Sequence, residues 1–471
     1  MLRVVMLSWE YPPRIVGGIS PHVFDLSKEL VKLGIEVHVV TKATPQAPDE
    51  EIEPSGVHVH RVHLEHEPND FVHEIQLLNR ATDLRVRQLL EDWRPGGQPT
   101  LFHAHDWLSL DSARELKYEY QLPMIATVHA TEEGRNGGIF SPMQKYIHEQ
   151  EYWLTYEAWR VIVCSEYMKE QVGRSFACPQ DKIEVIYNGV DARKFEFEWD
   201  DDSRDAWRKK LALPKEKIVM YVGRFVREKG IQLLLNSAST ILANEPDTKF
   251  VIVGGGNRER FEKFVRWYGL QDKVLFTGFM ANRSLHQLYR CADVAVFPSL
   301  YEPFGIVALE GMAAGAAVVT SDAGGLKEVC LHNVSGTNFF AGNSNSLAWA
   351  VLSVLRDPKK ADRMKKMARA RLYLDFNWEN IAAQTRDLYF SVWNEFVTSH
   401  HAGSSLWPIL EGAEERAERA HVKQKAVVGG FESRKVVPSH VQAPAEPVKV
   451  DKIAPGRLAD SSEEIDDGVS E

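Results

Sequence analysis

The most informative segment of the sequence is Tyr301-Glu302-Pro303-Phe304-Gly305-Ile306-Val307-Ala308-Leu309-Glu310, followed at once by Gly311-Met312-Ala313-Ala314-Gly315. A proline and a glycine come just after the first glutamate, which indicates a turn that opens a helix. The small apolar residues that follow are typical of a helix packed closely on a sheet. Residues 316–319 are a short apolar run, which predicts a buried strand of a parallel sheet. The whole pattern predicts an α/β fold.

This helix carries two carboxylates. Glu302 lies at its N-terminus, where backbone N–H groups are free and the helix dipole favours anions, and Glu310 lies further along. The arrangement suits a phosphorylated ligand that also has hydroxyl groups, with N–H groups for the phosphate and carboxylates for the hydroxyls. The alternative is an amphipathic helix with two acidic surface residues, so the other motifs have to decide.

Length and composition indicate a globular protein with room for two domains. The chain has 471 residues, of which 44% are hydrophobic and 26% charged. The formal net charge of −10 argues against binding nucleic acid through its phosphates. The four cysteines are far apart and form no C-x-x-C pair, and no apolar run is long enough for a signal or a membrane-spanning segment. We therefore expect a cytoplasmic protein.

The first half opens with a strand, a glycine loop and a helix. Residues 3–7 predict a buried strand, and the loop after it contains Gly17 and Gly18. The helix is predicted to start with Ser20 as N-cap and Pro21 in the first helical position. Open α/β sheets bind ligands at the carboxyl ends of such strands, and glycine lets backbone N–H groups approach a phosphate. The G-x-G-x-x-G fingerprint of nicotinamide enzymes is absent from the sequence, which argues against hydride transfer.

Two further strands of the first half are expected to end in histidines. Residues 101–105 lead to His105, Asp106 and Trp107, and residues 123–128 lead to His129 and a glycine-rich loop that carries Arg135. Neighbouring strand ends share one edge of a sheet, so we expect a cleft in which histidine bonds sugar hydroxyls or transfers protons. The alternative is that each histidine is satisfied by nearby backbone.

The stretch Val57–His63 alternates apolar and polar residues, which predicts a strand with one solvated face. Its three histidines have no carboxylate or cysteine at a matching spacing. We therefore expect no metal site there.

The second half repeats the order of strand, glycine loop and helix. Residues 218–222 predict a strand, and the loop Gly223–Gly230 after it carries Arg224 and Lys229. Two cations at the carboxyl end of a strand suit a pyrophosphate, because arginine binds as a fork and lysine as a point charge. The alternative is a solvated charged loop.

The end of the chain predicts one long helix and then a tail. Residues 378–396 are rich in aromatic residues, with apolar positions at helical spacing. Beyond residue 400 the periodicity fades, and residues 460–471 hold six acidic and no basic side chains. We expect residues 401–471 to be a disordered acidic tail.

Six segments in this order resemble the retaining glycosyltransferases of family four, over roughly residues 1–397. The segments are Trp9-Glu10-Tyr11-Pro12-Pro13 with Gly17-Gly18, His103-Ala104-His105-Asp106-Trp107, Thr127-Val128-His129-Ala130, Asn188-Gly189-Val190-Asp191, Gly223-Arg224-Phe225 with Glu228-Lys229-Gly230, and Glu302 to Glu310. The family has the GT-B architecture of two facing Rossmann-like domains. Within it, the chain is most similar to the glycogen and starch synthases.

The resemblance implies how the chain is divided. An N-terminal Rossmann-like domain on the acceptor side would cover residues 1–200, and a C-terminal Rossmann-like domain that binds the nucleotide sugar would cover 201–376. Residues 377–400 would form a crossover helix that returns to the first domain.

The resemblance also implies roles for single residues. The donor pyrophosphate would meet backbone at Gly17 and Gly18 from the first domain and the side chains of Arg224 and Lys229 from the second. The backbone of Phe304, Gly305 and Ile306 would bind the phosphates and the sugar of the donor. The Glu310 carboxylate would bind the hydroxyl groups of its ribose. The catalytic residues would be Glu302 beside the transferred sugar, His129 at a sugar hydroxyl, and the cations Lys229 and Arg224. His105, Asp106, Trp107 and Arg135 are the acceptor-side candidates.

The activity implied is a retaining transfer of glucose from ADP-glucose or UDP-glucose to an α-glucan. Because cations and helix N-termini can neutralise the leaving diphosphate, we expect neither a metal nor another cofactor. Two departures from the synthase pattern leave the donor base and the acceptor open. Val16 stands where synthases commonly have a lysine before the glycine pair, so Arg14 is the nearby cation. The segment Thr131–Gly138 also differs from that of bacterial glycogen synthases.

Three alternatives remain open from the sequence. A family-four enzyme could transfer another hexose to a lipid, capsule or small-molecule acceptor, and a nucleotide-sugar epimerase could use the same architecture. A non-catalytic sugar-binding relative is the third, and the intact residues Glu302, Glu310, Arg224 and Lys229 argue against it.

Overall fold

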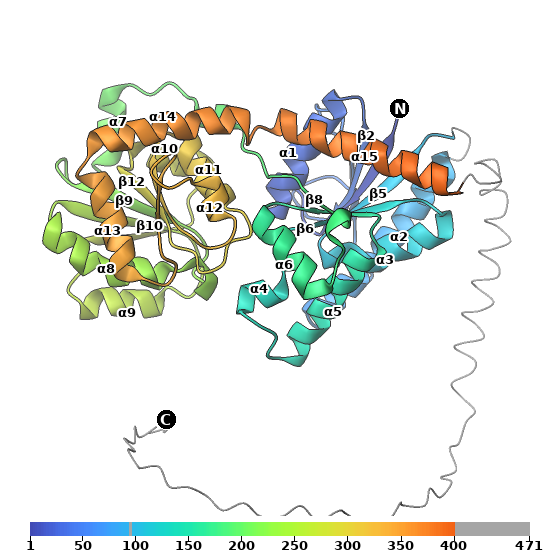
Figure 1. The fold of residues 1–471 in the computed structure, drawn as a ribbon, viewed down its shortest axis with the longest axis horizontal. Coiled ribbons are helices and arrows are strands. Elements are labelled where there is room, and N and C mark those ends of the chain that lie inside the picture. Colours follow the sequence, from blue (N-terminus) through green and yellow to red (C-terminus); the bar gives the residue numbers. More distant parts are fainter. Residues whose placement is uncertain (94–96, 401–471) are drawn as a thin grey trace, which may run out of the picture. The chain divides into compact units, whose positions relative to one another are not determined.

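The computed structural model describes residues 1–93 and 97–400, which belong to one compact unit. The predicted disordered tail, residues 401–471, lies outside the described residues. Two α/β halves follow each other along the described chain, and each is built on its own sheet (Figure 1).

Eight strands form the sheet of the first half within the described residues, in the order β3-β4-β2-β1-β5-β6-β7-β8. Neighbouring strands run parallel except β3, which pairs antiparallel with β4 at the edge. The strands are β1 (Arg3–Leu7), β2 (Glu36–Lys42), β3 (Glu50–Ile52), β4 (His58–Val62), β5 (Thr100–His105), β6 (Met124–Val128), β7 (Arg160–Val163) and β8 (Ile183–Val185).

Helices cover both faces of this sheet. Val4 and Met6 of β1 pack into a core with the apolar face of α1, whereas Val5 and Leu7 point to the opposite face and a separate core, as the two-residue period of a strand requires. The helices are α1 (Ile19–Lys32), α2 (Phe71–Trp93), α3 (Leu110–Tyr120), α4 (Glu132–Asn136), α5 (Pro142–Glu157) and α6 (Glu166–Phe176), with 3₁₀ turns at η2 (Trp107–Ser109), η3 (Gln180–Lys182) and η4 (Ala192–Phe195).

The sheet of the second half is all parallel, in the order β11-β10-β9-β12-β13-β14. Its strands are β9 (Lys217–Val222), β10 (Thr248–Val253), β11 (Val274–Gly278), β12 (Val294–Phe297), β13 (Ala317–Ser321) and β14 (Thr337–Phe339). The helices are α7 (Asp201–Arg208), α8 (Ile231–Asn244), α9 (Glu259–Trp267), α10 (Asn282–Cys291), α11 (Ile306–Ala313), α12 (Leu326–Val329), α13 (Ser344–Leu355) and α14 (Pro358–Leu374), with a 3₁₀ turn η5 (Arg227–Lys229). The chain changes sheets between β8 and β9, and the predicted boundary at residue 200 falls in this connection.

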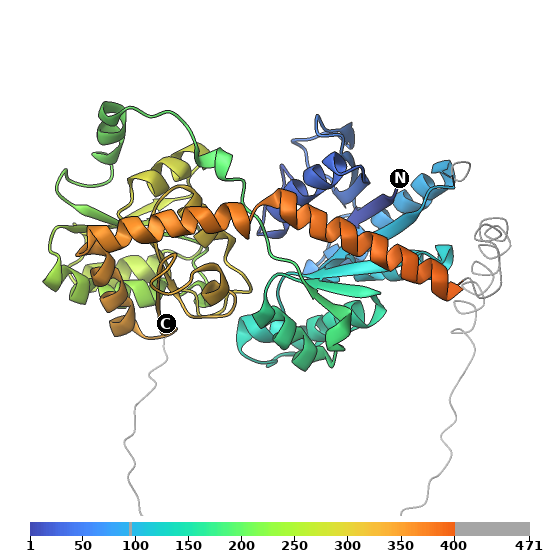
Figure 2. The ribbon, with the colours of Figure 1, turned by 45° about the horizontal axis from the view of Figure 1, so that its top comes forward.

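The last described helix, α15 (Trp378–His400), returns to the first half, as expected of a crossover helix. It runs beside α1 in both ribbon views (Figure 2), and its buried residues Trp378, Ile381 and Tyr389 belong to the same core as α1. The Tyr389 hydroxyl lies 2.7 Å from Nδ1 of His103 on β5. The helix therefore joins the two halves after the second sheet is complete.

Two local predictions are wrong. Helix α1 begins at Ile19 with Gly18 as its N-cap, and the Ser20 hydroxyl donates to the Arg14 carbonyl oxygen instead of capping the helix. Strand β4 is not solvated on one face, since His60 and Arg61 are both buried. On the histidine face, the Arg85 guanidinium of α2 lies 3.2 Å from Nδ1 of His60, so this helix covers it, whereas Arg61 on the other face donates to the carbonyl oxygens of Pro12 and Pro48 at 3.0 and 2.8 Å.

Candidate active site

A pocket of about 490 Å³ lies where the carboxyl ends of strands from both sheets come together. Open α/β sheets bind ligands at this edge. The pocket contains most of the residues that the sequence singles out from each half. Among those predicted, its lining includes Gly17, Gly18, Asp106, Trp107, His129, Arg135, Arg224, Lys229, Glu302, Phe304, Gly305 and Ile306.

The loop after β1 is organised by a buried carboxylate. Glu10, only 1% exposed, accepts hydrogen bonds from the backbone N–H groups of Val16 and Gly17, the latter at 2.9 Å. The Gly17 N–H is thus already bonded within the loop. Arg14 is not among the residues that line the pocket, and its guanidinium lies over the ring of Trp9 and 3.6 Å from Glu74. The first half therefore presents no cation from this loop, and a pyrophosphate contact at Gly17 and Gly18 stays a prediction.

The ends of β5 and β6 bring the predicted acceptor-side residues together. Asp106 accepts a hydrogen bond from the backbone N–H of His129 at 2.7 Å, and Nδ1 of His105 lies 3.2 Å from Nε2 of His129. His105 is fully buried behind the pocket and does not line it. Burial, and then the nearby Arg135 guanidinium, lower the pKa of His129 to about 3. The imidazole that faces the pocket is therefore neutral at pH 7.

The loop after β9 supplies the cations. Nζ of Lys229 lies 2.7 Å from Oε2 of Glu302, and the Ser299 hydroxyl donates to the same oxygen at 3.1 Å. Arg224 also lines the pocket, but its side chain is 60% exposed and makes only a long contact of 3.5 Å with Glu228. The fork of Arg224 is therefore available to a ligand, whereas Lys229 is held against the carboxylate.

Gly230 makes this loop possible. It ends η5 with φ +65°, and a Cβ at this position would lie 1.8 Å from the Pro298 carbonyl oxygen. No residue with a side chain fits so close to another backbone, so the end of β12 can approach the loop and bring Glu302 to Lys229.

The N-terminus of α11 points its free backbone N–H groups toward this pocket. Gly305 is the N-cap with φ +112°, and Phe304, Gly305 and Ile306 all line the cavity. Glu302 precedes the helix by one turn, as the sequence predicts. Such a helix start is suited to a phosphate or another anion.

Glu310 is not among the residues that line the pocket. Its carboxylate lies 3.3 Å from the Tyr289 hydroxyl on α10, and burial raises its pKa to about 7. A ribose that reached Glu310 would have to extend from the pocket along α11, so this role stays a prediction.

Direct contacts tie the two halves together beside the pocket. The Tyr301 hydroxyl accepts a hydrogen bond from the Thr131 N–H at 3.2 Å, and the Ser165 hydroxyl donates to the Pro303 carbonyl oxygen at 2.7 Å. Glu328 accepts from two N–H groups at the start of α6, each at 2.9 Å. The residues around Glu302 are therefore held from both sides.

Sequence reasoning missed four residues of this region: Glu10, His22, Asn188 and Tyr301. Glu10 and Asn188 line the pocket, and His22 lies directly behind His129. Glu10, Asn188 and Tyr301 belong to the motifs quoted above, but their roles depend on partners that lie far away in the sequence or across a loop. His22 gave no signal of its own.

Comparisons with known proteins identify the family of the chain. Residues 16–194 match the family description "Glycosyltransferase Family 4", and residues 203–371 match "Glycosyl transferases group 1". An uncharacterized glycosyltransferase of Methanocaldococcus jannaschii is 37% identical over 390 residues, covering 82% of this chain and 98% of the relative. The chain therefore belongs to the family-four glycosyltransferases, and it has the GT-B fold.

Two further similar proteins have a named activity. It is 34% identical to a glycogen synthase of Mycobacterium tuberculosis over 409 residues, which cover 83% of this chain and 95% of that protein. The solved sucrose-phosphate synthase of Thermosynechococcus elongatus superposes with a TM-score of 0.71 at 28% identity, covering 84% of this chain and 100% of that one. The protein is a glycosyltransferase similar to both.

Within the described residues, no helix combines the length and the apolar character needed to cross a bilayer. The four cysteines all lie in this part of the chain as buried free thiols.

Proposed function

We propose that the protein transfers glucose from ADP-glucose or UDP-glucose to the end of an α-glucan, with retention of the anomeric configuration and without a metal. The observation that carries the proposal is the single pocket that joins Lys229, Glu302 and the start of α11 from one half to His129 from the other. A sugar that bridges a diphosphate and a hydroxyl acceptor needs this combination of cations, N–H donors and neutral hydrogen-bonding groups.

The second half supports the leaving group. A departing nucleoside diphosphate gains negative charge, and preorganised positive charge usually contributes more to catalysis than any other single effect. Lys229 and Arg224, with the N–H groups at the start of α11, supply it inside the pocket. Because these groups neutralise the diphosphate, the transfer needs no metal ion.

The pair of Glu302 and Lys229 has to change partners when donor binds. Lys229 now lies 2.7 Å from Glu302, so a diphosphate would attract the ammonium group away and leave the carboxylate facing the sugar. A carboxylate there stabilises the positive charge that develops on the anomeric carbon. His129, which is neutral, offers a hydrogen bond to a sugar hydroxyl from the opposite side.

The glucan acceptor is supported by the similarity to a glycogen synthase over most of both chains. A small phosphorylated acceptor is the second candidate, because the sucrose-phosphate synthase has the same fold and its product is a small phosphorylated sugar. The loss of a lysine at Val16 removes a cation that the glucan synthases commonly have beside the glycine pair.

The reaction is tested by giving the protein ADP-glucose or UDP-glucose together with glycogen, maltodextrin or a hexose phosphate. We expect nucleoside diphosphate release that depends on glucan, new α-linked glucose by NMR, and no loss of rate in EDTA. If only the hexose phosphate accepts glucose, the acceptor is a small phosphorylated sugar and not a glucan. Absence of transfer from either donor would refute the proposal.

The same assay without acceptor tests the epimerase hypothesis, since an epimerase would convert the donor into a second nucleotide hexose. We expect no second nucleotide hexose.

We also propose that the reaction takes place in the cytoplasm, because four buried thiols and no disulfide among them are typical of a reducing compartment.

A further inference from the structure

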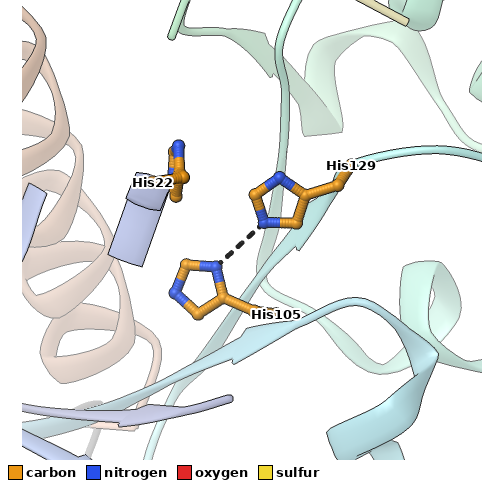
Figure 3. A group of neighbouring side chains, drawn as sticks. All are labelled: His22, His105 and His129. Atoms are coloured by element: carbon orange, nitrogen blue, oxygen red, sulfur yellow. Dashed lines mark hydrogen bonds between the residues drawn. The ribbon is translucent and has the colours of Figure 1, made fainter. Parts of the chain in front are cut away.

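Three histidines from separate elements gather at the wall of the pocket, with His129 lining it. His22 comes from α1, His105 from the end of β5, and His129 follows β6 (Figure 3). One ring nitrogen from each lies within 4.8 Å of the other two. We call these residues the histidine trio.

The ring nitrogens of the trio are only partly used by the protein. Nδ1 of His22 lies 2.7 Å from the Asn188 side-chain oxygen, and Nδ1 of His105 lies 3.2 Å from Nε2 of His129. Nε2 of His22 and Nε2 of His105 have no hydrogen-bonding partner among the described residues. Both residues are buried, with only 4% and 0% of their surface exposed, so water does not replace the missing partner freely. Buried polar atoms usually have a partner, so the orphaned Nε2 of His22 beside the His105–His129 pair points to a ligand.

The trio has the chemistry of a transition-metal site. Neutral imidazole is a common ligand of Zn²⁺, and Zn–N bonds of about 2.0–2.1 Å place two such nitrogens roughly 3.3 Å apart. Nδ1 of His105 and Nε2 of His129 are already 3.2 Å apart, close to this value, and a metal bound to this pair would leave Nε2 of His105 as the N–H of its ring. Burial holds all three imidazoles neutral by lowering their pKa values, so no proton has to leave before a metal binds.

Asn188 also supplies the support that metal-binding histidines usually have. Its side-chain oxygen accepts a hydrogen bond from Nδ1 of His22, which leaves Nε2 of that ring with its lone pair free. Because Asn188 and His129 both line the pocket, an ion can enter from the cleft.

We propose that the histidine trio binds Zn²⁺ or a similar transition-metal ion, with one nitrogen from each imidazole, and that the bound ion inhibits sugar transfer. A metal bound to His129 would fix the imidazole that faces the sugar and would occupy one of its two nitrogens, so that this nitrogen could not form a hydrogen bond to the sugar. Mg²⁺ and Mn²⁺ prefer oxygen ligands, so they should not bind. The inhibition rests on the proposed function, whereas the binding does not.

The test is calorimetric titration of the full-length protein, stripped with a chelator, with ZnSO₄ and separately with MgCl₂. We expect one Zn²⁺ per chain and no binding of Mg²⁺. His22→Gln should raise the Kd for Zn²⁺ at least about a hundredfold, and Asn188→Ala about tenfold, in line with the 10–100-fold cost of losing a supporting partner. His38→Gln removes another buried histidine of the same half and should leave the Kd unchanged.

A second measurement needs no variant. Crystals soaked in ZnSO₄ should show one strong anomalous peak at the zinc edge, between the three imidazoles. No Zn²⁺ binding, a peak elsewhere, or an unchanged Kd in a folded His22→Gln protein would overturn the site.

The inhibition is measured separately on the active protein. Zn²⁺ at ten times its Kd should lower the rate of transfer about tenfold, and EDTA should restore it. Binding without inhibition would overturn the inhibitory role and leave the site standing. A protein that binds Zn²⁺ and transfers no sugar in EDTA would instead refute the proposed function.

Discussion

The two halves use the same order of strand, loop and helix, but the loop after the first strand has a different role at the pocket in each half. In the first half, the loop after β1 bonds to its own carboxylate, Glu10, and the pocket side chain beyond it is a neutral histidine, His129. In the second half, the loop after β9 turns Arg224 and Lys229 toward the pocket. One loop therefore acts as a scaffold and the other as the source of positive charge.

Lys229→Met should have the largest effect on the charged loop of the second half. Because Lys229 is the partly buried cation beside Glu302, we expect kcat/KM for sugar transfer to fall by about 10²–10³, the effect of losing one preorganised charge-stabilising group. Arg227→Met is the matched control, since Arg227 is exposed in the same loop and does not line the pocket. Equal losses in both variants would mean that the loop acts only through its net charge.

A second prediction concerns Glu310, a carboxylate of the second half that forms no ion pair among the described residues, although Lys194 is near enough to attract it. Burial raises the pKa of Glu310 to about 7, so the folded state disfavours the charged form. The stability that this group contributes is complete below the unfolded pKa and is lost as the pH rises through 7. Relative to Glu310→Gln, wild type should lose about 3 kcal/mol of unfolding free energy between pH 4.5 and 7, at about 1.4 kcal/mol per pH unit.

Urea unfolding at several pH values measures this difference. Glu65→Gln, at an exposed site of the first half, should show no such trend. A flat difference for Glu310→Gln would mean that its charge is compensated by the second half after all.

The scaffold role of the first loop predicts a loss of stability more than of rate. Glu10→Gln weakens two buried, charge-assisted hydrogen bonds to backbone, so the free energy of unfolding should fall by about 2 kcal/mol while kcat stays within about threefold. Denaturant unfolding and steady-state kinetics measure the two quantities. A collapse of kcat with unchanged stability would instead make Glu10 part of the chemistry.

The smallest expected effect is that of Arg224→Met. Its side chain is 60% exposed, so solvent screens its charge, and we expect kcat/KM to fall only about tenfold. The loss should shrink further at high salt. A loss as large as that of Lys229→Met would show that Arg224 becomes buried against the donor.

Much of this arrangement could be predicted from the sequence. The loops at Gly17 and Lys229 and the turn at Glu302 each follow an apolar strand, and parallel sheets bring such strand ends to one edge. The return of α15 followed from the resemblance to the family. These features depend on local patterns, which a single sequence carries.

The parts that could not be predicted depend on contacts between distant residues. His22 lies on the buried face of α1, where the sequence gives it no special signal. The rings of His105 and His129 that contact it come from the end of β5 and from the loop after β6. Ser20 has the residue type of an N-cap, but its hydroxyl is taken by the Arg14 carbonyl. Glu10 lies in a loop, and nothing in the sequence shows that the backbone N–H groups of Val16 and Gly17 donate to its carboxylate.

The most direct test of the shared pocket is a crystal structure with UDP-glucose or ADP-glucose bound. We predict that the diphosphate lies about 3 Å from Nζ of Lys229 and that the sugar lies between Glu302 and His129, as charge-assisted hydrogen bonds require. Lys229 should then have exchanged its carboxylate partner for the phosphate. A donor bound outside the pocket, with the Lys229–Glu302 pair intact, would contradict the account.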